Sequence, residues 1–316
     1  MRIVSFLPSA TEVAFTLGLG DDVVGVSHEC DYPPEARTRP AVVHCAIPLD
    51  GLTPNEIDSA VSTQLRVGGS IYTIDTELLK ALAPDLILAQ DLCEVCAPSD
   101  NETERAVAAL AGRAKVLTMA PRSLAEIQEN LRQLGDATGR SNVARSLIDE
   151  QNARMRRLRE SLRGATPRRV FFIEWIDPIF CGGHWVPEQI ELAGGIDALG
   201  RKGSDSVRVS FADVVDWAPE ILIVSPCGAH LDEAVSQAQT MLADDRWQAI
   251  PAVESGNVFA VDASNYFARP GPRVFEGIEL LAHLFHPDVV PEVVKAASRQ
   301  LPRERVNSVR SIRQHR

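Results

Sequence analysis

Aromatic side chains are scarce in this sequence, at 5% of its 316 residues, and acidic residues outnumber basic ones by 43 to 32. Proteins that bind nucleic acid need clustered Lys and Arg, commonly beside aromatic rings on which bases stack. A net charge of −11 and so few rings argue against a nucleic-acid partner. The one basic stretch, residues 303–316, is interpreted as a solvated tail.

Long apolar runs are also missing. No stretch approaches the roughly 18 apolar residues that a membrane-spanning helix needs. Met1 and Arg2 lead directly into an apolar segment, residues 3–6, that is typical of a first strand. The basic region, apolar region and cleavage site of a secretion signal are not found there. We therefore expect no membrane insertion and a cytoplasmic location.

Cysteine is too sparse for a fold built on disulfides. In a cytoplasmic chain of this size, cysteines are expected to be free thiols, metal ligands or redox groups. The six are Cys30, Cys45, Cys93, Cys96, Cys181 and Cys227. A phosphate-binding P-loop, a nucleophile elbow and a Ser–His–Asp set at a usable spacing are absent too. The sequence gives no catalytic residue, and a binding protein is favoured over an enzyme.

Short apolar runs alternate with amphipathic segments along most of the chain, a pattern typical of parallel α/β sheets. Buried strands are predicted at residues 3–6, 23–26, 86–89, 115–119, 170–173, 221–224 and 258–261. Residues 123–138 and 141–163 are instead polar, amphipathic and rich in good helix formers. The expected parts are an N-terminal α/β lobe (1–121), connecting helices (122–165), a C-terminal α/β lobe (166–290) and a basic tail (291–316).

A weak internal repeat indicates that the two lobes are related. Residues 78–88 read Leu-Leu-Lys-Ala-Leu-Ala-Pro-Asp-Leu-Ile-Leu, and residues 213–223 read Asp-Val-Val-Asp-Trp-Ala-Pro-Glu-Ile-Leu-Ile. Both predict a helix, an Ala-Pro-acid turn and a buried strand, followed by a loop with cysteine. The expected fold class is α/β, with two Rossmann-like lobes on central parallel sheets, one long joining helix, and a ligand cleft between the lobes.

Thiols and imidazoles gather in the loops that follow the predicted strands. Cys93 and Cys96 form a lone C-x-x-C, which can be half of a zinc site, a redox pair or a pair of plain loop cysteines. His28 and Cys30 follow a neighbouring strand and could converge with them. Such ligands suit zinc or iron. The full set of metal-ligand candidates is His28, Cys30, Cys93, Cys96, His184 and Cys227.

Polar and aromatic residues in the same loops are candidates for ligand contacts. Trp175 and Trp185 could pack on a flat ligand or lie in the core. Arg269 could pair with an anionic group of a ligand or with a carboxylate of the protein. The candidates are Ser9, Glu29, Tyr32, Gln90, Glu174, Trp175, Trp185, Asn265, Tyr266 and Arg269. The remaining histidines, which are His44, His230, His283 and His286, are expected to be structural or surface residues, as is Cys45.

Ser9 also has a local interpretation. Glu12 stands three residues after it, and this spacing matches a capping box at the start of a helix. The helix N-terminus could instead offer its N–H groups to an anion.

The order of several motifs resembles a known family. The chain carries Ser-Phe-Leu-Pro-Ser-Ala-Thr-Glu (5–12), Leu-Gly-Leu-Gly (17–20), Val-Gly-Val-Ser (24–27), Asp-Tyr-Pro-Pro (31–34), Ala-Pro-Asp-Leu-Ile-Leu (83–88) and Tyr-Phe-Ala-Arg-Pro (266–270). With the connecting helix, these motifs cover roughly residues 2–287. They are similar to the helical-backbone, class III substrate-binding proteins of ABC importers, and most similar to the vitamin B12-binding members.

The resemblance implies a two-lobed binding protein that holds a corrinoid, siderophore, haem or metal ion between its lobes. B12-binding members have a tryptophan in the loop after residue 88, where this chain has Gln90 and two cysteines. Family members dock on a permease through an acidic residue on each lobe. Glu104 matches the first position, but Ala212, with Asp213 beside it, occupies the second. Docking on a permease is therefore not predicted, and the oligomeric state is left open.

The function expected from the sequence is that of a leaderless, cytoplasmic small-molecule binding protein. Its ligand would be cobalamin, a related corrinoid or another metal-containing molecule. One alternative is an enzyme that processes a metal cofactor, or a zinc, iron or redox protein, using Cys93 and Cys96. Another is a protein-interaction module that keeps the fold without the ligand.

Overall fold

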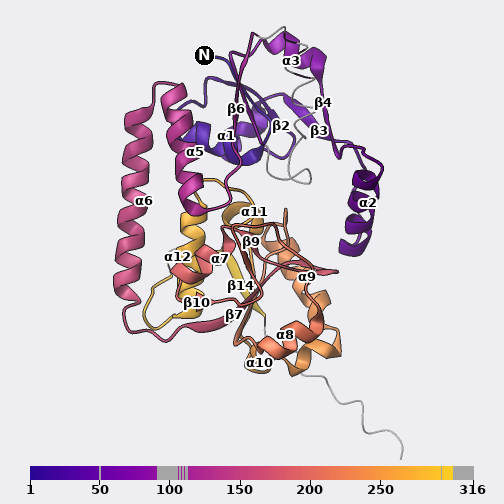
Figure 1. Cartoon of the computed structure of the whole chain (residues 1–316), viewed down its shortest axis with the longest axis vertical. Helices are drawn as coiled ribbons and strands as arrows, with labels where there is room; N and C mark the ends of the chain where they lie inside the picture. Colours follow the sequence, from indigo (N-terminus) through magenta and orange to yellow (C-terminus); the bar gives the residue numbers. More distant parts are fainter. Residues whose placement is uncertain are drawn as a thin grey trace, which may run out of the picture.

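Two sheets with mainly parallel strands organise the chain in the computed structural model, which describes residues 1–49, 51–90, 106, 108, 110, 113–292 and 294–301. The strand orders are β4-β3-β2-β1-β5-β6 and β10-β7-β12-β13-β14, so each sheet belongs to one half of the chain. Figure 1 shows the N-terminal lobe above the C-terminal lobe, with long helices along one side. The predicted two-lobed α/β fold is confirmed.

The N-terminal sheet is parallel except at its β3–β4 edge. Its strands are β1 (Ile3–Ser5), β2 (Val23–Ser27), β3 (Ala41–Cys45), β4 (Tyr72–Ile74), β5 (Leu86–Ala89) and β6 (Lys115–Thr118). Its helices are α1 (Pro8–Thr16), the 3-10 helix η1 (Pro34–Thr38), α2 (Pro54–Arg66) and α3 (Thr76–Leu82). The residues of β1 and β5 are buried throughout, because helices and loops cover both faces of the sheet.

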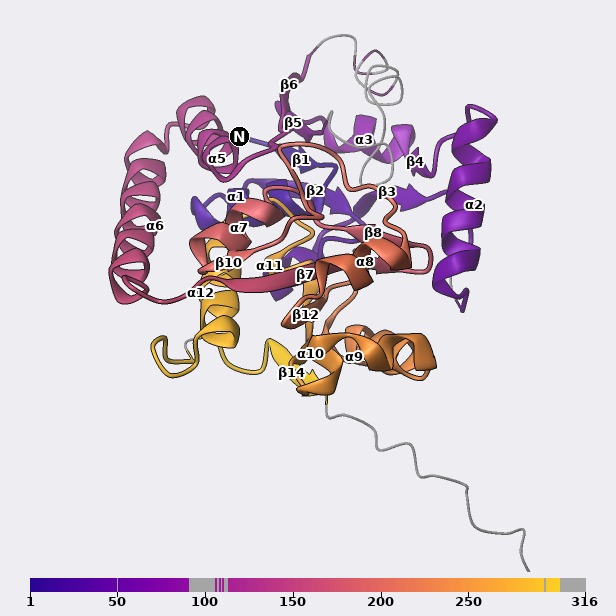
Figure 2. The same ribbon diagram turned by 60° about the horizontal axis from the view of Figure 1, so that its bottom comes forward.

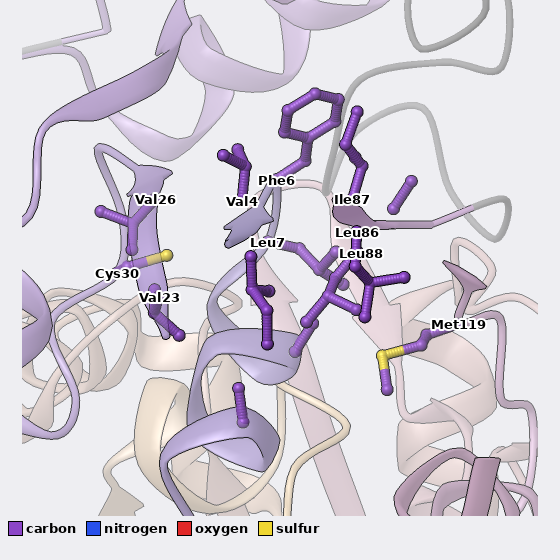
Figure 3. Close-up of a cluster of buried hydrophobic side chains, with 14 of the residues drawn as sticks. Val4, Phe6, Leu7, Val23, Val26, Cys30, Leu86, Ile87, Leu88 and Met119 are labelled. Atoms are coloured by element: carbon purple, nitrogen blue, oxygen red, sulfur yellow. The ribbon is translucent and has the colours of Figure 1, made fainter. Parts of the chain in front are cut away.

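The core of this lobe is mainly aliphatic, and Val4, Phe6, Leu7, Ile87 and Leu88 are all almost fully buried (Figure 3). Cys30 belongs to the same cluster.

The C-terminal sheet is built on a long first strand, β7 (Arg168–Ile176), which pairs in parallel with β12 (Ile221–Val224). The other strands are β8 (Ile179–Cys181), β9 (Gly183–His184), β10 (Gly195–Ile196), β11 (Arg201–Lys202), β13 (Val258–Val261) and β14 (Ser298–Leu301). The helices are α7 (Val186–Leu192), α8 (Phe211–Trp217), α9 (Leu231–Leu242), η2 (Asp245–Ala249), α10 (Pro251–Glu254), α11 (Ala263–Tyr266) and α12 (Val274–Phe285).

Two helices connect the lobes, as the sequence predicts: α5 (Leu124–Ala137) and α6 (Ser141–Ser161). They run antiparallel along one side of the molecule (Figures 1 and 2). Arg154 on α6 donates two hydrogen bonds to Glu279 on α12, at 3.0 and 2.5 Å. The long helix is therefore tied to the C-terminal lobe at a point before its end.

The internal repeat is reproduced in the backbone of the two lobes. Ala83 after α3 and Ala218 after α8 both take left-handed conformations, with φ of 42° and 49°. The acid that follows each Ala-Pro pair accepts a hydrogen bond from a backbone N–H beside the first strand of its lobe. Asp85 bonds to Arg2 at 2.8 Å, and Glu220 bonds to Arg169 at 2.9 Å. The same helix–turn–strand unit thus supplies an interior strand, β5 or β12, to each sheet.

Four elements depart from the sequence-based expectations. Residues 41–45 and 72–74, where no strand is predicted, pair as antiparallel β3 and β4. Helix α9 follows β12 without a strong start signal, because no side chain caps it. The segment predicted as a basic tail contributes β14 at residues 298–301, antiparallel to β13.

The predicted capping box at Ser9 is wrong. Leu7 is the N-cap of α1, Pro8 occupies the first turn, and no side chain caps the helix. Ser9 lies within the helix, so Glu12 is not needed to cap it and is free to reach the other lobe.

Close packing of α11 on α12 fixes the segment between them. A β-carbon at Gly277 would lie 2.6 Å from the Tyr266 carbonyl oxygen and 2.9 Å from Gln189 Nε2. We expect Gly277→Ala to lower the free energy of unfolding by about 1–3 kcal/mol through overpacking, although alanine favours a helix by about 1 kcal/mol. Urea unfolding measures this, with Ser59→Ala on the exposed side of α2 as control. An unchanged or higher stability for Gly277→Ala would contradict the crowding.

Candidate functional site

A buried ion pair joins the two lobes. Glu12 on α1 is 3% exposed, and Arg273, just before α12, is 8% exposed. The guanidinium donates to Glu12 Oε2 from Nε at 2.9 Å and from Nη2 at 2.7 Å, and the Arg273 backbone N–H donates to Oε1 at 3.2 Å. Both carboxylate oxygens therefore have a donor, which offsets the cost of removing the two charges from water.

Two further groups complete the surroundings of Arg273. Its Nη1 donates to the Asn265 side-chain oxygen at 2.6 Å. Its Cζ lies 3.7 Å from the centroid of the Tyr32 ring, a cation–π contact with the N-terminal lobe. Burial lowers the pKa of Arg273, but the hydrogen bonds and charge of Glu12 outweigh burial and raise it overall. The guanidinium is thus a fixed cation at the lobe interface.

A second ion pair crosses the interface at Asp31. Arg269 donates from Nη1 to Asp31 Oδ1 at 2.5 Å and from Nη2 to the Glu29 carbonyl oxygen at 3.2 Å. His230 Nε2 lies 2.9 Å from Asp31 Oδ2. Burial raises the pKa of the Asp31 carboxyl, but Arg269 and His230 together outweigh it and hold the pKa below its usual range.

The local sequence explains the placement of both arginines. Pro270 and Pro272 fix their own φ angles near about −65°, so the segment between Arg269 and Arg273 has few conformations. Gly271 sits between them, against the Glu12 carboxylate. A β-carbon there would lie 3.0 Å from Glu12 Cδ. The glycine therefore lets the arginine segment approach the N-terminal lobe closely.

Helix α2 provides a separate contact between the lobes, at the edge seen on the right of Figure 2. Trp175 Nε1 donates to the Pro54 carbonyl oxygen at 3.2 Å and to the Asp177 carbonyl oxygen at 3.1 Å. Arg208 donates to Asp58 at 2.8 Å. No residue of α2 is buried, so these polar contacts tie an exposed helix to the C-terminal lobe.

Several predicted ligand contacts meet at this interface. Tyr32, Asn265 and Arg269 all lie within the network described above, and Glu29 joins it through its carbonyl group. Tyr266 is half-buried beside them, and burial raises the pKa of its hydroxyl.

Other residues predicted to contact a ligand are buried or hydrogen-bonded within their own lobe. Trp185 is 4% exposed in the C-terminal core and donates to the Phe267 carbonyl oxygen at 2.9 Å, so its core interpretation is the observed one. Ser9 and Gln90 are buried. Glu174 accepts a hydrogen bond from the Gly183 N–H at 3.0 Å.

The predicted metal ligands do not converge in the described part of the chain. His28 Nδ1 lies 3.1 Å from the Val43 carbonyl oxygen, whereas Cys30 Sγ lies 3.1 Å from Thr11 Oγ1 on the opposite side of β2. Burial raises the pKa of the Cys30 thiol to about 11, which keeps it protonated and a poor ligand. Across residues 1–49, 51–90, 113–292 and 294–301, no three His, Cys, Asp or Glu side chains gather as a metal site.

The remaining metal candidates are separated. His184 pairs with Asp205 at 3.0 Å, and burial lowers the pKa of its imidazole in spite of that carboxylate. Cys227 is half-buried in the loop after β12. Cys93 and Cys96 lie outside the described residues, as does Glu104 of the predicted docking pair, so their roles stay predictions. Asp213, beside the second docking position, caps α8 through Ser210.

Sequence reasoning missed the residues that hold the interface together. They are Glu12, Asp31 and Arg273. The only local signal is the rigid Arg-Pro-Gly-Pro-Arg run at 269–273, which indicates two arginines at a fixed spacing. Their partners lie 238 and 261 residues away in the chain, and a single sequence does not pair them.

Breaking the buried ion pair should destabilise the protein strongly. We expect Glu12→Gln to lower the free energy of unfolding by about 3–5 kcal/mol, because it leaves the Arg273 charge buried without a counterion. Glu129→Gln is the matched control, since Glu129 pairs with Arg132 on the exposed surface of α5 and its loss should destabilise the protein far less. Urea unfolding followed by tryptophan fluorescence measures both, and equal losses would refute the argument.

No described helix has the length and apolar character that crossing a membrane requires.

Known proteins similar to the chain share its architecture over most of its length. The vitamin B12-binding protein of Vibrio cholerae is 26% identical over 281 residues, covering 88% of this chain and 86% of that protein. An uncharacterized ABC transporter substrate-binding lipoprotein of Bacillus subtilis, YvrC, is 26% identical over 296 residues, covering 92% and 82%.

Solved structures agree with these relatives. The periplasmic vitamin B12 binding protein BtuF of Vibrio cholerae has a TM-score of 0.65 and 26% identity, covering 90% of this chain and 96% of that one. The periplasmic heme-binding protein RhuT from Roseiflexus sp. RS-1 has a TM-score of 0.67 and 24% identity, covering 91% and 98%, and shows the fold alone. The sequence model of the family described as periplasmic binding protein matches residues 3–264. Because this match spans most of the chain, the chain belongs to the periplasmic binding protein family.

Proposed function

We propose that this protein binds a corrinoid such as cobalamin between its two lobes and does not transform it. The observation that carries the proposal is the likeness to vitamin B12-binding proteins of Vibrio cholerae, in sequence and in structure, over 86% and 96% of those chains. The family is one of substrate-binding proteins, which supports binding over catalysis.

The charges at the lobe interface favour a corrinoid over haem. Haem carries two carboxylates, which need cations that the protein has not already neutralised. In the described part of the interface, Arg269 is paired with Asp31 and Arg273 with Glu12. A corrinoid carries mostly neutral amides at its edge, which need hydrogen-bonding groups and an aromatic surface rather than free cations.

Aromatic side chains at the edges of the interface suit a large flat ligand. Tyr32 is 42% exposed in the N-terminal lobe. Trp175 is half-buried in the C-terminal lobe, where its indole N–H bonds to the other lobe. Rings contributed by both lobes can pack on a ligand that both lobes contact.

Calorimetric titration tests the proposal. Cyanocobalamin should bind with one ligand per chain, and haemin should bind at least about tenfold more weakly. We expect Trp175→Phe to weaken cyanocobalamin binding by about threefold to tenfold, because the smaller ring offers less contact area and lacks the indole N–H that bonds to Pro54. Trp217→Phe is the matched control, because Trp217 on α8 donates to the Val170 carbonyl oxygen inside the C-terminal lobe. Absence of cyanocobalamin binding, or tighter binding of haemin, would overturn the proposal.

We also propose that the protein acts in the cytoplasm. The cysteines in the described part of the chain, which are Cys30, Cys45, Cys181 and Cys227, are free thiols, and free thiols suit a reducing compartment.

Fractionation of cells that express the native gene tests this location. The protein should separate with a cytoplasmic marker, and a thiol reagent that does not cross membranes should label it only after lysis. Recovery with the periplasmic fraction, or labelling of intact cells that have a permeable outer membrane, would contradict the proposal.

A further inference from the structure

We propose that His230 is a pH-sensitive latch between the two lobes, which tightens at acidic pH and regulates exchange of the bound ligand. Its effect on the ligand rests on the proposed function, whereas its effect on the lobe interface does not. The proposal stands on the position of the imidazole between two carboxylates, one from each lobe.

The imidazole bridges the lobes through both of its nitrogens. Nε2 lies 2.9 Å from Asp31 Oδ2 in the N-terminal lobe, and Nδ1 lies 3.3 Å from Asp262 Oδ2 in the C-terminal lobe. His230 itself is the N-cap residue of α9. Asp262 is further held by Asn265, whose backbone N–H and side-chain amide donate to it at 2.9 and 2.8 Å.

This geometry requires the charged form of the ring. An ionised carboxylate only accepts hydrogen bonds, and a neutral imidazole has a single N–H to give. Two carboxylate contacts therefore need two N–H groups, which only the imidazolium has. In the neutral ring, one nitrogen would turn a lone pair toward a carboxylate, and that contact becomes repulsive.

The carboxylate on the N-terminal lobe keeps its charge as the pH falls. Burial raises the pKa of Asp31, but Arg269 and His230 outweigh burial and leave it below its usual range. Histidine side chains exchange their second proton between about pH 5 and 8. Asp31 is thus ionised throughout that interval.

The other charged groups around His230 are mixed in sign. Arg269 faces it across Asp31, which it contacts at 2.5 Å, and Arg299 lies 3.6 Å from Asp232 on the first turn of α9. The charged side chains that contact the ring are Asp31 and Asp262. Asp232 and Glu233 follow it in the first turn of α9.

The direction in which pH changes the stability of the lobe interface follows from the number of N–H groups that His230 can donate. The imidazolium donates to both lobes, and the contact adds to the stability of the closed interface. The neutral ring loses one of the two bonds as the pH rises, whereas the pairs Arg269–Asp31 and Arg273–Glu12 keep their charges. The lobes are therefore loosened at alkaline pH without being released.

Thermal unfolding at two pH values tests the latch without a ligand. We expect His230→Gln to lower the Tm by about 2–4 °C at pH 6 and by less than about 1 °C at pH 8. His286→Gln is the matched control, because one N–H satisfies its contact with the Gly194 carbonyl oxygen and its effect should not shrink as the pH rises. Equal losses of Tm at both pH values for His230→Gln would overturn the latch.

Nitrogen NMR of the histidine rings gives a second readout that a merely structural role would not move. At pH 6 both nitrogens of His230 should carry protons, and Asp31→Asn should lower the fraction of the doubly protonated ring at a given pH. A single protonated nitrogen at pH 6 would contradict the geometry argued above.

The ligand measurement separates the two proposals. Stopped-flow dissociation of cyanocobalamin should become about fivefold faster between pH 6 and 8 in the native protein and change by less than about twofold in His230→Gln, as expected for one charge-assisted hydrogen bond. A pH dependence unchanged in the variant would overturn the regulatory role. If cyanocobalamin fails to bind at either pH, the proposed function fails, and the melting and NMR results still decide the latch.

Discussion

The buried pair between Glu12 and Arg273 is the interaction on which the arrangement of the lobes depends. Two charges with 3% and 8% exposure persist at an interface only when each finds its partner with good geometry. Here three N–H groups of Arg273 reach one carboxylate, and Gly271 leaves the room for that approach. The pair specifies one relative placement of the lobes, because a shift of either lobe would leave both charges buried and unpaired.

Around this fixed point, the interface is graded from buried to exposed. Next to the buried pair, Arg269 and Asp31 are partly buried, with side chains 15% and 17% exposed. His230 is about half exposed at the same site. Solvent weakens the more exposed contacts at Arg269 and His230. The buried Glu12–Arg273 pair therefore sets how the lobes are placed, and the more exposed contacts alter how strongly the lobes are held together. A ligand held between the lobes would thus lie beside one rigid buried ion pair and a set of weaker, more exposed contacts.

The turn that both lobes share and the residues that join the lobes have separate physical origins. The Ala-Pro-acid turn recurs at Ala83 and Ala218 with the same left-handed backbone and the same acid-to-backbone hydrogen bond, so it belongs to the scaffold. The interface residues do not repeat. Glu12 comes from the first helix of one lobe, whereas Arg273 precedes the last helix of the other. The contacts between the lobes are therefore made where the two copies of the scaffold differ.

The sequence by itself determined the two α/β lobes, their buried strands and the connecting helices, because hydrophobic periodicity and turn residues act over a few positions. Only the tertiary structure decided that Arg269 meets Asp31, that Trp185 lies in the core, and that Glu12 reaches the other lobe rather than capping its helix. Those outcomes depend on contacts between residues tens to hundreds of positions apart, and no local pattern records which distant charges will be brought together.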